Sequence, residues 1–364
     1  YSISSARNWG IGDFTDLREI ANRVAQMGGG CVGINPLHAI PNTKPFGTSP
    51  YSPVSRLYRN FIYLDIDDIP DVKESDDAMS IVQSEKFNRE VEELRKGEFI
   101  DYERVAALKK QALKPAFESF YEKHYRRNTG RARDFRRYLQ ENDSDLDMFA
   151  SYMALSDFFG VHRWHNWPDE YHDPSGKEVG KFKKTHNKEM LFYKYIQWLI
   201  DGQLRKIAAL CKERRMPVGI YHDLAVGSVS GGSDIWSHQG LLAIADTGAP
   251  PDDFSPDGQN WGFPPMIPEK LEDTGYDLFI KTIRSNMKYG GALRIDHAFG
   301  LFRLFWIPSG MSPGDGAYVL YPSEDLIRII ALESTRNKVI IIAEDLGTSG
   351  GNVRETLRKF NMLS

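Results

Sequence analysis

Two acidic residues that each follow an apolar segment are the strongest candidates for chemistry in this sequence. Asp296 comes directly after residues 291–295, and Glu344 comes directly after residues 339–343. Since side chains alternate along a strand, Arg294 is expected on the same face as Asp296. The carboxyl ends of buried parallel strands are where α/β barrels and open sheets assemble their active sites. The spacing therefore indicates a site built from paired carboxylates.

The chemistry of such a pair depends on whether the two strands are neighbours. If they are neighbours at equal height, the two carboxyl groups lie about 5–5.5 Å apart, the separation found in retaining glycosidases. Arg294 would then favour ionised Asp296 as nucleophile, and Glu344 would hold its proton as general acid and later act as base. Alternatively, both carboxylates are structural and pair with Arg294 or cap helices. Spacing alone leaves both interpretations open.

Two further polar residues stand at expected strand ends. Asp223 follows residues 218–221, as a third strand-end carboxylate or as a cap or turn residue. His297 follows Asp296 and is interpreted either as a partner of a sugar hydroxyl or as a residue that packs beside Phe299. The position of each residue allows both interpretations.

Three loop residues have side chains suited to sugars. Tyr51, Gln259 and Trp261 lie in loops that we expect at the same edge as the strand ends. Aromatic faces stack on the apolar C–H face of sugar rings, and amides satisfy hydroxyl groups. A single exposed aromatic residue is uninformative, so this pattern gains weight only beside the carboxylates.

Helical and apolar segments alternate along much of the chain. Helical periodicity is expected over residues 15–27, 190–215, 276–287 and 324–333. Each is followed by a short apolar segment typical of a buried strand, at residues 31–34, 218–221, 291–295 and 339–343. This alternation predicts a parallel sheet covered by helices.

Two stretches depart from this pattern. Residues 71–188 are rich in charged and aromatic residues and have helical spacing, which predicts a mostly helical insertion subdomain. The barrel portion would then comprise residues 1–70 and 189–364. Residues 227–265 are rich in Gly, Pro and Asp and are predicted to form one long loop, a feature that is usually functional.

The composition excludes several classes of protein. The 46 Lys and Arg residues against 50 Asp and Glu residues give a net charge of −4, which does not indicate a partner of nucleic acid or of a membrane surface. The mean hydropathy is −0.46, and no apolar run approaches the roughly 18 residues of a bilayer span. Two cysteines are too few for a disulfide framework or a Cys-based zinc site. We expect a globular, cytoplasmic protein.

Five motifs together resemble those of one family. They are RNWGIGDF at residues 7–14, SPYSP at 49–53, GQNWG at 258–262, ALRIDH at 292–297 and AEDLG at 343–347. In this order they are similar to motifs of the 4-α-glucanotransferases called amylomaltases or disproportionating enzymes, and the likeness spans nearly the whole chain. Residues 219–227, GIYHDLAVG, resemble the longer bacterial and plant cytosolic branch.

This resemblance implies a fold, an activity and roles for named residues. The fold would be an α/β (β/α)₈ TIM barrel with mostly helical insertions. The Asp of the ALRIDH motif falls on Asp296 as nucleophile, and the Glu of AEDLG falls on Glu344 as acid/base. The substrate-binding positions fall on Arg294, His297, Tyr51, Asp223, Gln259 and Trp261. The substrates would be maltooligosaccharides or other α-1,4-glucans, and the reaction would need no cofactor and no metal.

One family feature has no counterpart here. The family uses a third carboxylate, in a His-Asp pair on the seventh strand, which we expect to lie outside this sequence. We count four of eight barrel strands and expect the first strand and the last three to be missing. The segment alone is therefore expected to have negligible transferase activity. An α-amylase-type hydrolase and a noncatalytic glucan-binding protein remain as alternatives.

Overall fold

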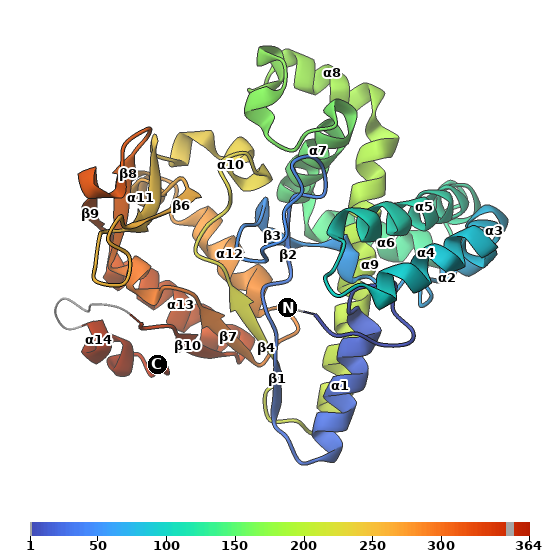
Figure 1. The fold of residues 1–364 in the computed structure, drawn as a ribbon, viewed down its shortest axis with the longest axis horizontal. Coiled ribbons are helices and arrows are strands. Elements are labelled where there is room, and N and C mark those ends of the chain that lie inside the picture. The colour runs from blue at the N-terminus through green and yellow to red at the C-terminus, as the bar shows by residue number, and fades with distance from the viewer. Residues whose placement is uncertain (1, 347–352) are drawn as a thin grey trace. The chain divides into compact units, whose positions relative to one another are not determined.

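The computed structural model describes residues 2–346 and 353–364. The chain forms two compact units (Figure 1). The first unit comprises Tyr1–Gly28, Pro41–Thr48 and Arg59–Arg214. The second unit comprises Gly29–Ile40, Ser49–Tyr58 and Arg215–Ser364.

A parallel sheet of four strands is the centre of the second unit. Its strand order is β1-β4-β7-β10. The strands are β1 (Cys31–Gly33), β4 (Gly219–Leu224), β7 (Ala292–Ile295) and β10 (Ile340–Ala343). All neighbouring pairs are parallel, which confirms the sheet predicted from the alternation of helices and apolar segments. Ile342 also forms an isolated parallel bridge with Leu363 near the end of the chain.

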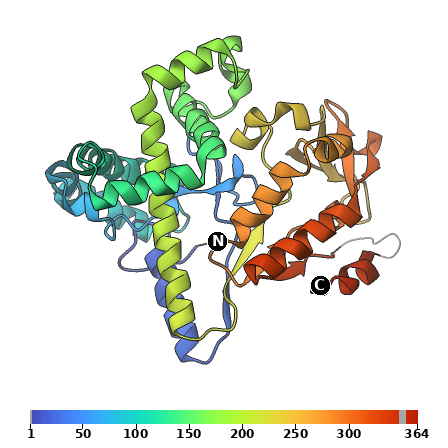
Figure 2. The same ribbon diagram turned by 180° about the vertical axis from the view of Figure 1, so that it is seen from behind.

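Two helices cover one face of this sheet. They are α12 (Asp277–Met287) and α13 (Ser323–Asn337), which lie side by side over the strands in Figure 2. Leu293 and Ile341 are buried in the apolar core that these helices form with β7 and β10. Because side chains alternate along a strand, Arg294 and Ile342 point to the opposite face. The packing of the core therefore fixes which side chains are available for a site.

A second, antiparallel sheet corrects the prediction of one long loop over residues 227–265. That stretch contains α10 (Ser233–Ser237), β5 (Ala245–Ala249) and β6 (Gln259–Phe263). With β8 (Arg303–Pro308) and β9 (Ala317–Leu320), the strands form a sheet in the order β6-β5-β8-β9. A Cβ atom at Gly248 would lie 2.0 Å from the Gln259 carbonyl oxygen, so this strand needs glycine where the backbones approach. The glycine that permits the pairing also gave the segment its loop-like composition.

The second unit also contains further short elements. They are β2 (His38–Ala39), β3 (Ser55–Arg59), α11 (Pro268–Asp273) and α14 (Val353–Lys359). β2 and β3 form a two-stranded sheet.

The first unit consists of helices. They are α1 (Phe14–Gln26), α2 (Pro70–Lys73), α3 (Asp76–Gln83), α4 (Glu85–Lys96), α5 (Tyr102–Phe120), α6 (Gly130–Glu141), α7 (Asp143–Phe159), α8 (Lys177–Thr185) and α9 (Asn187–Glu213). The helical character predicted for residues 71–188 is confirmed. None of the described helices combines the length and apolar character that a bilayer crossing requires.

The boundaries of the compact units differ from the predicted domain boundaries. Helices α1 and α9 were assigned to the barrel by their sequence pattern, but they belong to the same compact unit as the insertion helices. The reason is packing, because the 27-residue α9 contacts both α1 and α7. The division into a barrel of residues 1–70 and 189–364 and an insertion of residues 71–188 stays a prediction.

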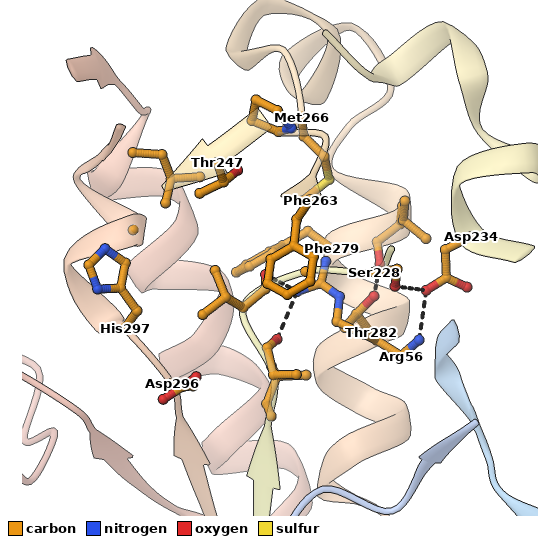
Figure 3. Close-up of a pocket in the computed structure, with 18 of the residues that line it drawn as sticks. Arg56, Ser228, Asp234, Thr247, Phe263, Met266, Phe279, Thr282, Asp296 and His297 are labelled. Atoms are coloured by element: carbon orange, nitrogen blue, oxygen red, sulfur yellow. Dashed lines mark hydrogen bonds between the residues drawn. The ribbon is translucent and has the colours of Figure 1, made fainter. Parts of the chain in front are cut away.

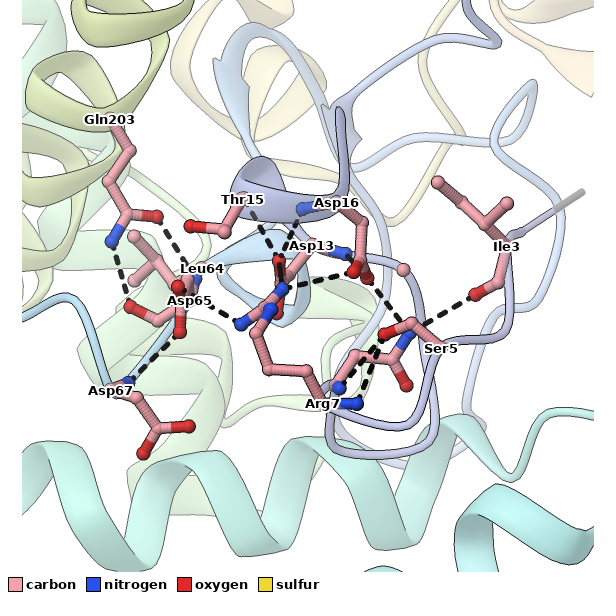
Figure 4. A network of polar contacts seen from close by, with 12 residues as sticks. Ile3, Ser5, Arg7, Asp13, Thr15, Asp16, Leu64, Asp65, Asp67 and Gln203 are labelled. Carbon is pink, nitrogen blue, oxygen red and sulfur yellow. Dashed lines mark hydrogen bonds and ion pairs between the residues drawn. The ribbon is translucent and has the colours of Figure 1, made fainter. Parts of the chain in front are cut away.

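A buried ion network organises the start of α1 (Figure 4). Asp13 caps the helix by accepting hydrogen bonds from the Thr15 and Asp16 amides, at 2.9 and 3.0 Å. The Arg7 guanidinium pairs with Asp13, with Asp16 at 3.1 Å and with Asp65 at 3.1 Å. The RNWGIGDF motif thus includes residues whose observed contacts are structural.

Candidate active site

The parallel register brings Asp296 and Glu344 to the same level on neighbouring strands. Ile342 pairs with Arg294 and Ala343 pairs with Ile295, so the next residues in register are Glu344 and Asp296. The Glu344 amide donates to the Ile295 carbonyl at 3.0 Å, which continues the ladder past the assigned strands. The condition that the two strands are neighbours is therefore met. The separation of about 5–5.5 Å between the carboxyl groups stays a prediction.

Backbone amides hold the Glu344 carboxylate in place. Its Oε2 accepts a hydrogen bond from the His297 amide at 2.9 Å, and its Oε1 accepts one from the Leu346 amide at 2.6 Å. His297 can offer this amide because its backbone adopts a left-handed conformation with φ of 49°, which is uncommon for a residue other than glycine. The turn after β7 therefore positions the side chain at the end of β10.

Arg294 joins Asp296 to a second carboxylate. Its Nη2 lies 2.7 Å from Asp296 Oδ1, and its Nη1 lies 2.9 and 3.0 Å from the two oxygens of Asp223. Asp223 is opposite Arg294 in the register between β4 and β7. The Tyr51 hydroxyl donates to Asp223 Oδ2 at 2.7 Å. A continuous series of hydrogen bonds and ion pairs thus connects the loop residue Tyr51 with Asp296.

Burial and neighbouring charges set the protonation of this network. Burial raises the pKa of Asp296, as do the charges of Asp223 and Glu344, and Arg294 acts in the opposite direction. The expected influence of Arg294 on Asp296 is therefore present, but burial outweighs it. For Arg294, burial lowers the pKa, yet Asp223 and Asp296 together raise it above its ordinary value. The Arg294 guanidinium therefore stays positively charged, and it pairs with both Asp223 and Asp296.

Two aromatic rings flank His297. The Trp261 ring meets the His297 ring edge-on, with centroids 5.0 Å apart, and Phe299 contacts the same imidazole at 6.4 Å. Trp261 Nε1 donates to Gln259 Oε1 at 3.0 Å. Burial lowers the pKa of His297 although Glu344 opposes this, so the imidazole is neutral at pH 7. A neutral imidazole can both donate and accept a hydrogen bond with a hydroxyl group.

A cavity of about 110 Å³ extends behind the strand ends (Figure 3). Asp296 and His297 lie on one side, and Arg56, Ser228 and Asp234 lie on the other. Asp234 Oδ2 accepts hydrogen bonds from the Ser228 hydroxyl and the Arg56 amide, both at 2.7 Å. These contacts support the segment that follows β4.

The contacts of Arg56 in this arrangement were not apparent from the sequence. Arg56 Nη1 donates to the Ala225 carbonyl at 3.2 Å and to the Val226 carbonyl at 2.7 Å. Arg56 lies 169 and 170 positions before these two carbonyl groups in the sequence, so no local pattern reveals the contacts. The proximity of Arg56 to the SPYSP motif was the one available signal. Gly347, the last residue of the AEDLG motif, lies outside the described residues.

All eight predicted site residues belong to the second compact unit. Tyr51, Asp223, Arg294 and Asp296 form one connected group, and His297 adjoins Glu344 through its amide and Trp261 through its ring. Gln259 is exposed and joins the group through Trp261. A carboxylate paired with a cation beside a carboxylate held by amides is suited to acid–base and nucleophilic chemistry.

Comparisons with known proteins identify the family of this chain. A family model described as 4-alpha-glucanotransferase matches residues 1–364. The chain is 40% identical over 376 residues to the 4-alpha-glucanotransferase of Haemophilus influenzae, covering 100% of this chain and 53% of that protein. The chain spans about half the length of the curated relatives it matches.

Two solved structures are similar in fold. The amylomaltase from Corynebacterium glutamicum matches with a TM-score of 0.86 and 32% identity, covering 100% of this chain and 49% of that one. The amylomaltase from Streptococcus agalactiae matches with a TM-score of 0.81 and 22% identity, covering 99% and 70%. The predicted TIM-barrel fold class is confirmed by these likenesses, whereas the absence of four barrel strands stays a prediction. With its family model, its relatives and its fold in agreement, the chain belongs to the 4-alpha-glucanotransferase family.

Proposed function

We propose that the protein transfers α-1,4-glucan segments between maltooligosaccharides by a retaining double displacement. The observation that carries this proposal is the matched register of Asp296 and Glu344 on neighbouring strands, with Arg294 paired to Asp296. Family membership supports the choice of reaction, because relatives of this chain are named 4-alpha-glucanotransferases.

In the first step, the Asp296 carboxylate attacks the anomeric carbon of the donor glucan. The bond from that carbon to the leaving 4-oxygen breaks as Glu344 transfers its proton to this oxygen. The product is a glycosyl ester on Asp296, together with the released glucan that carries a new 4-hydroxyl group.

In the second step, Glu344 acts as the base. It removes the proton from the 4-hydroxyl group of an acceptor sugar, whose oxygen attacks the anomeric carbon. The ester bond breaks, and Asp296 returns to its carboxylate form. Two inversions at one carbon give net retention of the α configuration.

The other predicted residues would bind and orient the sugar. Arg294 and Asp223 would hold Asp296 in its attacking position, and Tyr51 would fix Asp223. His297 would exchange hydrogen bonds with a sugar hydroxyl while Trp261 stacks on a ring. Gln259 would contact a neighbouring sugar unit.

The substrate class and location complete the proposal. The Streptococcus agalactiae amylomaltase was solved in complex with acarbose, which supports sugar ligands for this fold. We assign α-1,4-glucans as substrates and the cytoplasm as the location. No cofactor takes part in the steps given above.

The test is redistribution of maltotriose by protein expressed from the complete reading frame. The proposal predicts glucose together with maltooligosaccharides longer than maltotriose, separated by chromatography. Release of glucose and maltose without longer products would identify a hydrolase. Binding of maltotriose without any change in its length would identify a noncatalytic glucan-binding protein, and either result would overturn the proposal.

A further inference from the structure

A second cavity lies within the first compact unit, among its helices. It has a volume of about 460 Å³ and is bounded by α5, by the end of α7, by α8 and by the start of α9. All of its lining residues belong to this unit. We call it the Phe158 groove, after the most exposed aromatic ring in its wall. None of the residues of the candidate active site contributes to it.

An aromatic cluster forms the floor of the Phe158 groove. Phe158 is 58% exposed, although large aromatic side chains are usually buried. Its ring meets Phe182 at a centroid distance of 5.5 Å and His186 at 5.3 Å, both edge-on. Phe182 and His186 stack on each other at 4.1 Å with an interplanar angle of 12°. The cluster therefore restricts the orientation of a largely exposed aromatic ring.

Charged side chains line the rim, and their charges cancel. Lys114 and Lys188 carry two positive charges, and Glu118 and Glu189 carry two negative charges. Lys188 pairs with Glu118. In the part of the chain that the structure describes, the side chains of Lys114 and Glu189 form no hydrogen bond or ion pair. The rim thus offers one free donor group and one free acceptor group.

A fifth charged residue of the wall is already neutralised within the protein. Asp157 lies 2.7 Å from the Lys110 ammonium group and also accepts a hydrogen bond from the Tyr193 hydroxyl. It therefore adds no net charge to the groove. An anion or a cation would find no excess of opposite charge here, whereas a neutral ligand would find both donors and acceptors.

We infer that the Phe158 groove binds a short segment of α-glucan and is a second carbohydrate site of this protein. A sugar combines an apolar C–H face, which suits the Phe158 ring, with hydroxyl groups that both donate and accept hydrogen bonds, which suit the rim. The volume lies within the range of roughly 300–1,000 Å³ typical of small-ligand pockets. The choice of α-glucan as the ligand rests on the proposed function, in which α-glucans are the substrates of this protein.

The experiment measures maltoheptaose binding and locates it by hydrogen–deuterium exchange. It uses the Asp296→Asn variant of the protein from the complete reading frame, so that the sugar is not turned over. We expect slower exchange in residues 154–158 and 182–193 when maltoheptaose is present. Adding Phe158→Ala should remove this protection and weaken binding at this site by at least about tenfold, as measured by calorimetry.

Two further variants separate ligand contact from a change in folding. Phe99→Ala removes a ring that is 81% exposed and lies outside the groove, so it should leave the protection unchanged. Lys114→Ala removes an exposed side chain that forms no hydrogen bond or ion pair among the described residues, and it should weaken binding several-fold with no change in thermal unfolding. Equal effects of Phe158→Ala and Phe99→Ala would overturn the inference.

The outcomes also distinguish this inference from the proposed function. Protection of the groove by maltoheptaose supports the second site even if maltotriose is not redistributed by the unmodified protein. Redistribution without any protection of residues 154–158 and 182–193 overturns the second site and leaves the proposed function intact. Protection of these residues that persists in Phe158→Ala would also overturn the second carbohydrate site. Protection that appears only when another protein is added would assign the groove to that protein and overturn the site as well.

Discussion

Two arginine–aspartate clusters, one in each compact unit, differ in how their carboxylates are satisfied. In the first unit, Asp13 and Asp16 accept hydrogen bonds from backbone amides as well as from Arg7, and both are almost fully buried (Figure 4). In the second unit, the side chain of Asp296 is 23% exposed and, among the described residues, pairs with Arg294 alone. The carboxylates of Asp13 and Asp16 are thus buried and used to stabilise the start of α1, whereas the partly exposed carboxylate of Asp296 can meet a substrate.

The cluster in the first unit also contains a second cation, the buried Lys109. Lys109 is fully buried beside the Arg7 cluster and donates to the Leu64 carbonyl at 2.7 Å and to the Ile62 carbonyl. Burial lowers its pKa to about 8, although Asp13 and Asp65 oppose this. The first cluster should therefore affect stability, and the second should affect the rate of reaction.

The largest expected effect is on catalysis. Asp296→Asn and Glu344→Gln should each lower the rate of maltotriose redistribution by at least about a thousandfold, because they remove the nucleophile and the proton donor. Thermal unfolding should change little. Asp273→Asn, which alters an exposed carboxylate of the same unit, is the matched control and should leave the rate unchanged. Near-normal turnover in either site variant would reject its assigned role.

The next effect is on stability. Lys109→Met should lower the free energy of unfolding by about 2–6 kcal/mol, because it leaves two buried carbonyl oxygens, those of Ile62 and Leu64, without a donor at a cost of about 1–3 kcal/mol each. The rate per folded molecule should stay the same. Denaturant titration and active-site titration measure the two quantities separately. A loss of rate without a loss of stability would contradict the structural role of this cluster.

The same residue gives a pH dependence with a defined sign. The pKa of Lys109 is about 8 in the folded protein against 10.5 in the unfolded chain. Between these values the unfolded chain binds more protons, so stability rises with pH from about 8 to about 10.5. Lys109→Met should abolish this contribution, which is read as the difference between the two unfolding curves across that range. If the difference in unfolding free energy between the unmodified protein and Lys109→Met fell as the pH rose, the assigned pKa shift of Lys109 would be wrong.

A smaller effect is expected at Arg294. Arg294→Gln should lower the rate roughly a hundredfold and shift the acidic limb of the pH–rate profile to higher pH, because the cation that lowers the pKa of Asp296 is lost. Arg294→Lys restores the charge without the paired hydrogen bonds and should reverse part of the shift. An unchanged limb in Arg294→Gln would show that Arg294 does not influence the ionisation of Asp296.

The smallest effect is expected at Tyr51. Tyr51→Phe removes the hydrogen bond to Asp223 and should lower the rate roughly tenfold, the value of one hydrogen bond to a charged group. Tyr318→Phe, in the same unit, serves as the control. If both substitutions have the same effect, Tyr51 does not act through Asp223.

The sequence was sufficient to predict the parallel sheet and the residues at its strand ends. In the apolar segment 339–343, Val339, Ile341 and Ala343 are buried, and a charge at the carboxyl end of such a segment stands out. Strands β5 and β6 were missed because Gly248 and Gly262 give a loop-like composition, although the aromatic and apolar residues 303–308 could have indicated the neighbouring strand β8.

Contacts between distant residues lay beyond any local pattern. The Tyr51–Asp223 hydrogen bond joins residues 172 positions apart, and His297 adopts a left-handed backbone conformation although it is not glycine. Such features depend on tertiary structure. The strand-end rule could place Asp296 and Glu344 in one site, but it could not supply the amides that hold Glu344.

The covalent intermediate is the most direct test of the central claim. The Glu344→Gln variant is treated with α-maltotriosyl fluoride, whose fluoride leaves without a proton donor, and the products are analysed by intact-mass and peptide mass spectrometry. We expect one maltotriosyl ester to accumulate on Asp296, because this variant lacks Glu344, the base that would activate an acceptor. The absence of an ester, or an ester on another residue such as Asp223, would contradict it.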